Sequence, residues 1–454
     1  YELDYMMKTR TPTLEHRYKY TNNFYGHDWI WTCIHNFGQK PGIYGNLTSY
    51  ISGPLEAMKS SAANFNGIGL APEGINQNHV VYELASEMAW HNTTIDLAEW
   101  ISNFVRSRYN GSVESAKDAW ESMTDLSTMG VYTQNFANGE GVSGYVNGPV
   151  DLNLDTSLSP RDPPGHNTTN MCNVFHMLTR GLNDKSRPKT LAYDATDSGR
   201  QCLDNILWDL SRVFEGAFQR RDLNATLSVA KSWMDLADTL DTLLNSNSNF
   251  MLGTWLQQAH ATAVGDSQID LLDYNARNQI TLWGPTQNSL SDYARKSWGG
   301  LLKTYHVRGR WGITIDAALE SLRSNTTLNH TQISNAIASH ELTWQTNTSE
   351  SFLIFPTASI DEIFEADMKY VSSENITGYT YMENVDVEDS QWNLLQQPCW
   401  TRITGTLAFL CNSDPMCVGF SSSGLLYRRV SSSKTFNPDT DLVHHDGVNF
   451  YYSK

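Results

Sequence analysis

The sequence lacks the short motifs that mark several common chemistries. It has no CxxC pair, which argues against a zinc ribbon and against a thioredoxin-like redox site. It also has no P-loop, no GxSxG elbow and no HExxH zinc motif. His444 and His445 are adjacent, and neighbouring residues of a strand point to opposite faces, so both are poorly placed to bind one metal. We therefore expect no metal and no cofactor.

Long apolar runs and positive charge are scarce as well. No run approaches the roughly 18 apolar residues of a transmembrane helix, so we expect no membrane span. The chain has 32 Lys and Arg against 49 Asp and Glu, a net charge of −17, which argues against a nucleic-acid partner. Trp and Tyr are plentiful, at 14 and 21. Aromatic faces suit sugar rings, although most Trp in a large protein lies in the core.

Several features favour the secretory pathway, with a lysosomal, vacuolar or secreted destination. The chain begins at Tyr1 without a leader, so we expect a longer precursor. It has nine N-x-[ST] glycosylation sequons, at Asn46, Asn92, Asn110, Asn167, Asn224, Asn325, Asn329, Asn347 and Asn375. Cys33 lies in an apolar run and is expected to be a buried free thiol. Cys411 and Cys417 close a short loop and predict a disulfide, with Cys399 as the alternative partner of either.

The pattern predicts a mixed fold in three parts. Residues 1–80 hold apolar runs at 1–7, 28–37 and 65–71, unbroken by alternation, as in strands buried on both faces of a parallel sheet or barrel. Residues 51–63 read as a crossover helix between two of these strands. Residues 81–370 carry repeated apolar stripes at helical spacing, interrupted by a Gly/Pro/Asn-rich stretch at 134–170. Residues 371–454 have short strand-like runs and predict a small β-rich module.

Glu73 is the first candidate for chemistry. It ends the apolar stretch GIGLAPEG, and the C-terminal ends of barrel strands are where catalytic groups gather. A carboxylate there can act as a nucleophile or a general base. The alternative is an ordinary turn carboxylate before a helix, and the local pattern alone favours it. Asp4, near the first run, is better explained as a cap or a buried network residue.

Four further residues are candidates for substrate binding. His35 and Asn36 end the preceding strand, so they would share a rim with Glu73 and bind a sugar hydroxyl, or simply form a polar pair at a strand end. Trp283 lies in LWGP, which breaks a helical stretch, and Tyr293 follows in the next one. The two could form an aromatic wall for a sugar ring, or Trp283 could be a core residue at an interhelical corner.

Three stretches together resemble the lysosomal α-N-acetylglucosaminidase family, glycoside hydrolase family 89. They are WIWTCIHNFGQKPGIYG (29–45), GIGLAPEGINQNHVVYELASEMAW (67–90) and the segment from MLGTWLQQAHATAVG to NQITLWGPTQNSLSDYARK (251–296). The resemblance implies the last strands of a (β/α)8 barrel in 1–80 and an all-α domain over the active site in 81–370. It implies that Glu73 is the catalytic nucleophile. It also implies that Trp283, Leu290 and Tyr293 line an N-acetylglucosamine pocket, although one extra residue separates Trp283 from Tyr293 here.

The chain departs from this family in two ways. The family's acid/base Glu lies on an earlier barrel strand, which this sequence does not contain, and a retaining hydrolase needs two carboxylates roughly 5–5.5 Å apart. An open barrel edge also invites aggregation. We therefore expect an upstream N-terminal chain that completes the barrel. The tail differs too, because AFLCNSDPMCVGFSSSGLLYRR resembles apple/PAN-like modules that bind proteins or carbohydrates.

The resemblance thus implies a retaining exo-glycosidase that removes terminal α-linked N-acetylglucosamine from glycans. It suggests heparan sulfate degradation as the setting, but the sequence leaves the natural glycan open. The alternative is a catalytically inactive glycan-binding or structural assembly protein on the same scaffold. The sequence leaves the oligomeric state open, a homo-oligomer included.

Overall fold

The computed structural model describes residues 17–33, 35, 42–60, 64–72, 78–111, 113–133, 146, 168–183, 188–284, 294–357 and 360, and seven short strands between 379 and 453. The chain forms two compact units, and each is assembled from three segments that are separate in the sequence. Unit 1 comprises residues Tyr1–Pro149, Asp162–Gln201 and Trp255–Ser297. Unit 2 comprises residues Val150–Arg161, Cys202–Thr254 and Trp298–Lys454.

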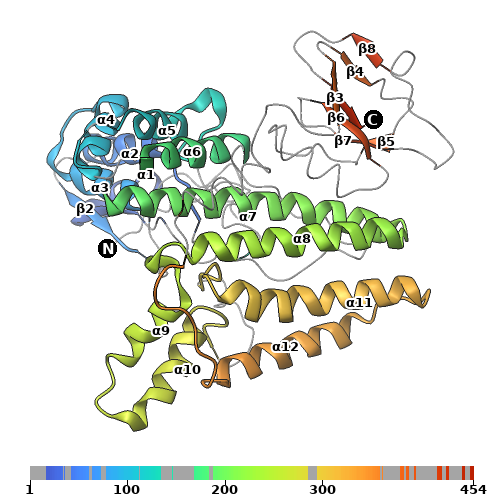
Figure 1. The fold of residues 1–454 in the computed structure, drawn as a ribbon. Helices are drawn as coiled ribbons and strands as arrows, with labels where there is room; N and C mark the ends of the chain where they lie inside the picture. Colours follow the sequence, from blue (N-terminus) through green and yellow to red (C-terminus); the bar gives the residue numbers. More distant parts are fainter. Residues whose placement is uncertain are drawn as a thin grey trace. The chain divides into compact units, whose positions relative to one another are not determined.

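Unit 1 contains a parallel pair of strands. Strands β1 (Trp29–Cys33) and β2 (Phe65–Leu70) pair in parallel, with Trp31 opposite Ile68 and Cys33 opposite Leu70. Helix α2 (Leu47–Ser60) connects the two strands and packs against both. Figure 1 shows α2 near β2. This confirms the strand–helix–strand unit that the sequence predicts. The apolar run at 1–7 lies outside the described residues.

The expectation that these strands are buried on both faces holds for β1 and is wrong for β2. Strand β1 is almost wholly buried, whereas every residue of β2 is half-buried or exposed, and Leu70 is 38% exposed. The reason is that β1 is the only strand beside β2 in the described part of the chain. A strand with one neighbour keeps an uncovered edge and loses the cover that a second neighbour would give.

Aromatic side chains hold the sheet to its surroundings. Trp29 stacks on Tyr18 at 5.1 Å and meets Phe65 edge-on at 5.4 Å. Trp31 is fully buried and meets Tyr50 of α2 edge-on at 6.3 Å. Such offset and edge-on pairs add about 0.5–1.5 kcal/mol each beyond their buried area. The apolar run therefore fixes how α2 sits on the sheet.

The rest of the described part of unit 1 is mainly helical, as the stripes predict. Its helices are α1 (Arg17–Tyr20), α3 (His79–Glu87), α4 (Leu97–Arg108), α5 (Glu114–Thr124), α6 (Thr168–Arg180), the start of α7 (Lys189–Gln219), most of α9 (Leu252–His260) and α10 (Ile269–Gln279). Asp96 caps α4 by accepting from the Glu99 amide at 2.9 Å. Phe104 of α4 meets Trp120 of α5 at 4.9 Å, so the apolar faces of these helices pack together.

Unit 2 is built around a bundle of helices. They are the rest of α7, α8 (Leu223–Leu244), the π-helix η10 (Leu302–Arg310), α11 (Trp311–Arg323) and α12 (His330–Thr346). Trp233 of α8 lies between Phe214 and Trp311, at 6.0 and 5.9 Å. Both units also contain short 3-10 turns. In unit 1 these are η1 (Phe24–Gly26), η2 (Met88–Trp90), η3 (Leu126–Thr128), η6 (Gly181–Asn183) and η8 (Asp266–Gln268), and in unit 2 there is η7 (Ser248–Phe250).

The strands near the C-terminus pair antiparallel. Strands β3 (Tyr379–Met382), β5 (Asn393–Leu394), β6 (Cys417–Ser421), β7 (Leu426–Arg428) and β9 (Phe450–Ser453) form one sheet in the order β3-β9-β6-β7-β5. Strands β4 (Val385–Val387) and β8 (Leu442–His444) form a separate pair. The segments between these strands lie outside the described residues.

The structure gives the bonding state of three cysteines, Cys33, Cys172 and Cys202. Cys33 is buried and free, which confirms the sequence prediction, and burial raises the pKa of its thiol to about 12. Cys172 and Cys202 are disulfide-bonded, which the sequence did not suggest. Cys399 and Cys411 lie outside the described residues, so the proposed C-terminal disulfide stays a prediction. No helix in the described ranges has the length and apolar character needed to cross a membrane.

Candidate active site

The C-terminal ends of β1 and β2 lie at the same edge of the sheet, because the strands are parallel. The Ala71 amide donates to the Cys33 carbonyl at 3.0 Å, which carries the pairing one residue past β2. The chain that leads through Pro72 to Glu73 therefore leaves the sheet beside the chain that leads to His35. Glu73 and Asn36 themselves lie outside the described residues, so their positions and roles stay predictions.

His35 is held in a cage of tyrosines. Its Nδ1 is 2.9 Å from the Tyr50 hydroxyl, its ring stacks on Tyr44 at 4.5 Å, and Tyr82 meets it edge-on at 5.9 Å. The Tyr44 hydroxyl donates to the His35 carbonyl at 2.5 Å. Burial lowers the pKa of His35 to about 3, so its ring is neutral at neutral and mildly acidic pH.

The second ring nitrogen of His35, Nε2, lacks a hydrogen-bond partner among the described residues. This atom is also buried. A buried polar atom left unsatisfied costs about 1–3 kcal/mol. A water or a ligand hydroxyl beside Nε2 would remove that cost. Nε2 could therefore form the hydrogen bond that the predicted role of His35 in substrate binding requires. The rest of the ring is packed against tyrosines in the core.

Gly45 lets the chain after β1 lie against this cage. Its φ of +151° is in the range that favours glycine. A Cβ there would lie 3.2 Å from Val81, 3.3 Å from the His35 ring and 3.4 Å from Tyr132. Any side chain at position 45 would push these neighbours apart.

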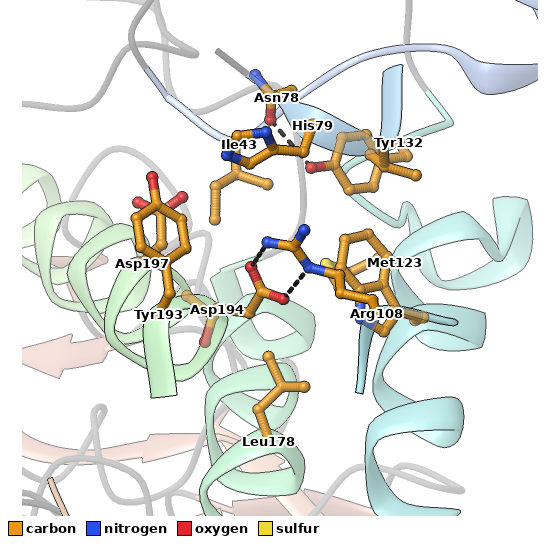
Figure 2. Close-up of a pocket in the computed structure, with 13 residues that line it drawn as sticks. Ile43, Asn78, His79, Arg108, Met123, Tyr132, Leu178, Tyr193, Asp194 and Asp197 are labelled. Carbon is orange, nitrogen blue, oxygen red and sulfur yellow. Dashed lines mark hydrogen bonds and ion pairs between the residues drawn. The ribbon is translucent and has the colours of Figure 1, made fainter. Parts of the chain in front are cut away.

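Asn78 anchors the chain on the other side of Glu73. It immediately follows residues 73–77 and precedes α3. Its Nδ2 donates to the Gly42 carbonyl at 3.0 Å. Its Oδ1 accepts from the Tyr132 hydroxyl at 2.9 Å (Figure 2). Both bonds are buried. The segment that carries Glu73 is therefore attached to the fold at both ends, by Ala71 and by Asn78.

A polar cluster braces the helices below Asn78. Arg108 donates to both oxygens of Asp194, at 2.5 and 2.7 Å (Figure 2). The Tyr109 hydroxyl donates to Asp194 at 2.7 Å and accepts from Trp120 Nε1 at 2.7 Å. Burial by itself lowers the pKa of Arg108. The hydrogen bonds and charge of Asp194 outweigh this effect, so the pKa of Arg108 lies above its usual value. The two hydrogen bonds between Arg108 and Asp194 join α4 to α7.

The cavity in this region is too small for a sugar. Its lining includes Asn78, Arg108, Tyr132, Tyr193 and Asp194, and its volume is about 30 Å³. That is room for about one water molecule, whereas ligand pockets span roughly 300–1,000 Å³. We interpret the cavity as a water site within the brace and not as the substrate pocket.

Trp283 lies at a separate turn of unit 1, just after α10. It is half-buried, and its φ is +53°, in the left-handed region. This conformation costs a residue with a Cβ roughly 1–2 kcal/mol. The Trp283 amide donates to the Asn278 carbonyl at 2.8 Å. Leu290 and Tyr293 lie outside the described residues, so the aromatic wall stays a prediction.

The described sequons differ in exposure. Asn92, Asn110, Asn224, Asn325, Asn329 and Asn347 are exposed. Asn46 is half-buried and bridges to Thr133, and its side chain accepts from the Ser49 amide at 3.2 Å. Asn167 and Asn375 lie outside the described residues.

Sequence reasoning missed Asn78, Arg108 and Asp194. Asn78 stands in the position of a helix N-cap, but its side chain makes no capping bond and binds Gly42 and Tyr132 instead. Arg108 and Asp194 are 86 positions apart, so no local pattern could pair them. The described residues contain no cluster of three or more His, Cys, Asp or Glu suited to a metal ion.

Comparison with known proteins places this geometry in a family context. Residues 100–359 match the family model of the alpha-N-acetylglucosaminidase (NAGLU) C-terminal domain, and residues 3–92 match that of the NAGLU tim-barrel domain. The chain is 32% identical to alpha-N-acetylglucosaminidase from Homo sapiens over 311 residues, which are 67% of this chain and 40% of the human protein.

The fold is similar to that of a family 89 glycoside hydrolase from Clostridium perfringens. The complex with 2-acetamido-1,2-dideoxynojirmycin aligns with a TM-score of 0.68 and 21% identity, and covers 82% of this chain and 42% of that one. The complex with its substrate GlcNAc-alpha-1,4-galactose aligns with a TM-score of 0.67, 20% identity and the same coverage. This chain thus spans about two fifths of the length of these relatives.

Proposed function

Because the chain belongs to the alpha-N-acetylglucosaminidase family, with part of a TIM barrel followed by a helical domain, we propose that it is the C-terminal part of a retaining exo-glycosidase. The substrate is a glycan that ends in α-linked N-acetylglucosamine, with heparan sulfate as the natural candidate. The observation that carries the proposal is the sheet edge described above. There the chain leading to Glu73 lies beside the chain leading to His35, and Ala71 and Asn78 attach it at both ends.

Glu73 is the nucleophile in this proposal. Its carboxylate attacks the anomeric carbon and forms a covalent glycosyl-enzyme. A Glu on an upstream barrel strand protonates the leaving oxygen and then activates the water that releases the sugar. Trp283, Leu290 and Tyr293 line the pocket, and His35 and Asn36 bind sugar hydroxyls. His35 serves as a neutral donor or acceptor through Nε2, because its lowered pKa keeps it uncharged.

The partner is the upstream part of the barrel, as a separate chain or as the preceding segment of one polypeptide. The support is the half-exposed strand β2, which has one strand neighbour in the described residues, and the two-fifths coverage of the relatives. The exposed sequons and the family support a lysosomal or secretory location. The strands after residue 378 support a small β-rich module, which we propose to be apple/PAN-like.

The test uses the full protein, with its upstream part, and an aryl α-N-acetylglucosaminide. The wild type should release the aryl group with retention of anomeric configuration, which NMR of the fresh product detects. Glu73→Gln should lower kcat about 10³-fold or more, as loss of a covalent nucleophile does. The matched control is Glu83→Gln, the same change on an exposed residue of α3, which should leave kcat unaltered.

The same experiment separates the proposal from the second candidate, an inactive glycan-binding protein on the same scaffold. Glycan binding without turnover in the full protein would support that candidate. Turnover that Glu73→Gln leaves unaltered would remove Glu73 from the mechanism.

A further inference from the structure

The turn that carries Trp283 has a feature that the proposed function does not use. A bulky residue with positive φ is uncommon, and such residues persist where their surroundings enforce the conformation, often at ligand sites. Glycine would adopt the same backbone without strain. A Trp at this position therefore points to a use for its indole ring.

One residue, Asn278, forms hydrogen bonds with the backbone on both sides of Trp283. The Asn278 carbonyl accepts from the Trp283 amide at 2.8 Å and from the Thr281 amide at 3.2 Å. Its side-chain Nδ2 donates to the Gly284 carbonyl at 2.5 Å. The backbone is thus fixed at the peptide before Trp283 and at the peptide after Gly284. With both bonds in place, the chain at Trp283 has little freedom to leave the left-handed region.

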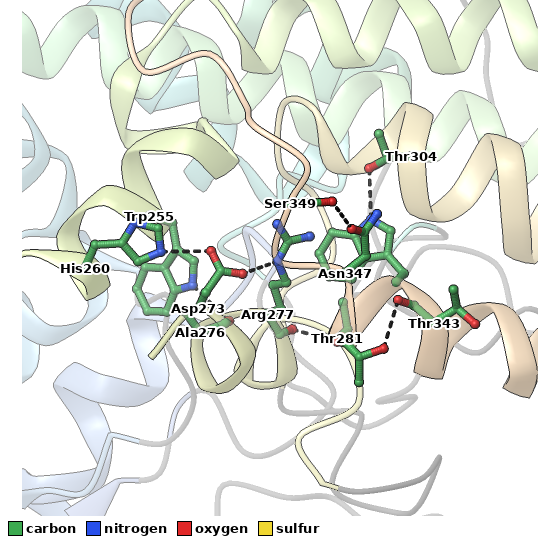
Figure 3. Close-up of polar contacts among 12 residues, drawn as sticks. Trp255, His260, Asp273, Ala276, Arg277, Thr281, Thr304, Thr343, Asn347 and Ser349 are labelled. Carbon is green, nitrogen blue, oxygen red and sulfur yellow. Dashed lines mark hydrogen bonds and ion pairs between the residues drawn. The ribbon is translucent and has the colours of Figure 1, made fainter. Parts of the chain in front are cut away.

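Asn278 is itself held on a fixed helix end. Its neighbour Arg277 is fully buried and bonds Asp273 one turn earlier, and Asp273 also lies 2.8 Å from His260 Nε2 (Figure 3). The Trp255 indole donates to the Ala276 carbonyl at 3.0 Å. These contacts attach α10 to α9 just before the turn. The two Asn278 hydrogen bonds, to the Trp283 amide and the Gly284 carbonyl, form a clamp on the turn, and this clamp is held on a rigid support.

We propose that Asn278 is a positioning residue of the sugar pocket, which acts by holding Trp283 in its left-handed conformation so that the indole faces the substrate. The inference rests on the proposed function, because it takes Trp283 as part of the N-acetylglucosamine pocket. The Asn278 side chain donates its Nδ2 hydrogen bond to the Gly284 carbonyl and not to the substrate. Its effect on the substrate is therefore indirect and passes through the conformation of Trp283. Without the clamp, the Trp283 backbone relaxes and the indole spends less time in the binding orientation.

The expected effect is on binding more than on the chemical step. In the full protein, Asn278→Ala should raise KM for the aryl α-N-acetylglucosaminide about two- to tenfold, the range for loss of one hydrogen bond, with little change in kcat. The inhibition constant for 2-acetamido-1,2-dideoxynojirmycin should rise by a similar factor. Asn278→Asp keeps the size and replaces the donor by an acceptor facing the Gly284 carbonyl, so its effect should be at least as large. Asn275→Ala, on an exposed face of α10, is the control that should change nothing.

A double-mutant cycle with Trp283→Ala separates positioning from a general structural role. If Asn278 acts through Trp283, Asn278→Ala should have no further effect on KM in the Trp283→Ala background. An equal effect in both backgrounds, or wild-type KM in both Asn278 variants, would overturn the inference while leaving the proposed function standing. A wild type without turnover, or a Trp283→Ala variant with unaltered KM, would refute the pocket itself and this inference with it.

Discussion

Replacing Asp209 by asparagine should change the stability of the protein in a pH-dependent way: relative to the wild type, the variant should gain stability as pH rises from 5 to 7. Asp209 lies on α7 in unit 2 and is only 2% exposed. Its Oδ2 has no hydrogen-bond partner in the described part of the chain. Burial raises the pKa of this carboxyl from 3.8 to about 8. The folded protein therefore holds a proton here that the unfolded chain releases above pH 3.8.

The size of the effect follows from that pKa difference. Between pH 3.8 and 8 the folded state binds the extra proton, so stability falls by about 1.36 kcal/mol per pH unit. The accumulated cost is about 4 kcal/mol at pH 7, and nearly 3 kcal/mol of it builds up between pH 5 and pH 7. Asparagine removes this cost and adds a buried amide, which costs about 1–3 kcal/mol if its donors find no partner. The amide cost does not vary with pH, so the difference of nearly 3 kcal/mol between pH 5 and 7 is independent of it.

Thermal unfolding of the wild type and of Asp209→Asn at pH 5, 6 and 7 measures this effect. The difference in Tm should widen by several degrees over that range. Asp235→Asn, the same change on an exposed residue of α8, should show no such widening. A Tm difference for Asp209→Asn that stays constant with pH would show that the carboxyl is ionised in the folded protein, and the reasoning would fail.

Three further predictions concern packing, modification and thiol reactivity. Gly130→Ala should lower stability by about 1–3 kcal/mol in a denaturation experiment, because a Cβ there would lie 2.5 Å from two backbone carbonyl oxygens. When the protein is made in a secretory host, Asn92→Gln should lower its mass by one glycan and Asn46→Gln should not, because Asn92 is exposed whereas Asn46 is half-buried and bonded. In peptide mapping by mass spectrometry, Cys33 should resist iodoacetamide in the folded protein and react after unfolding. Its pKa of about 12 leaves only about 10⁻⁴ thiolate at pH 8.

The elements of the fold are largely local properties, and the sequence predicts most of them. Apolar residues at helical spacing give α4, α5 and α8, and caps such as Asp96 and Asp222 set where helices begin. Unbroken apolar runs with a helix between them predict β1, α2 and β2 and their parallel order. These signals depend on spacings within a few turns of chain, so one sequence carries them in full.

The site divides along a similar line. The placement of Glu73 after β2 and of His35 after β1 is visible in the sequence, because strand ends and Pro-Glu-Gly turns are local. The partners of Asn78 are not visible, because Gly42 and Tyr132 lie 36 and 54 positions away. The exposure of β2 could not be predicted either, since a run of apolar residues does not say whether another strand lies beside it.

The sequence by itself determined the elements, the order of the strands and the residue types available for sugar chemistry, because periodicity and turn residues act over short distances. Only the tertiary structure decided which side chains meet. It alone caged His35 in tyrosines and lowered its pKa, joined Arg108 to Asp194, and fixed Trp283 in a left-handed turn beside Asn278. These outcomes depend on burial and on partners, and both are set by how distant segments pack.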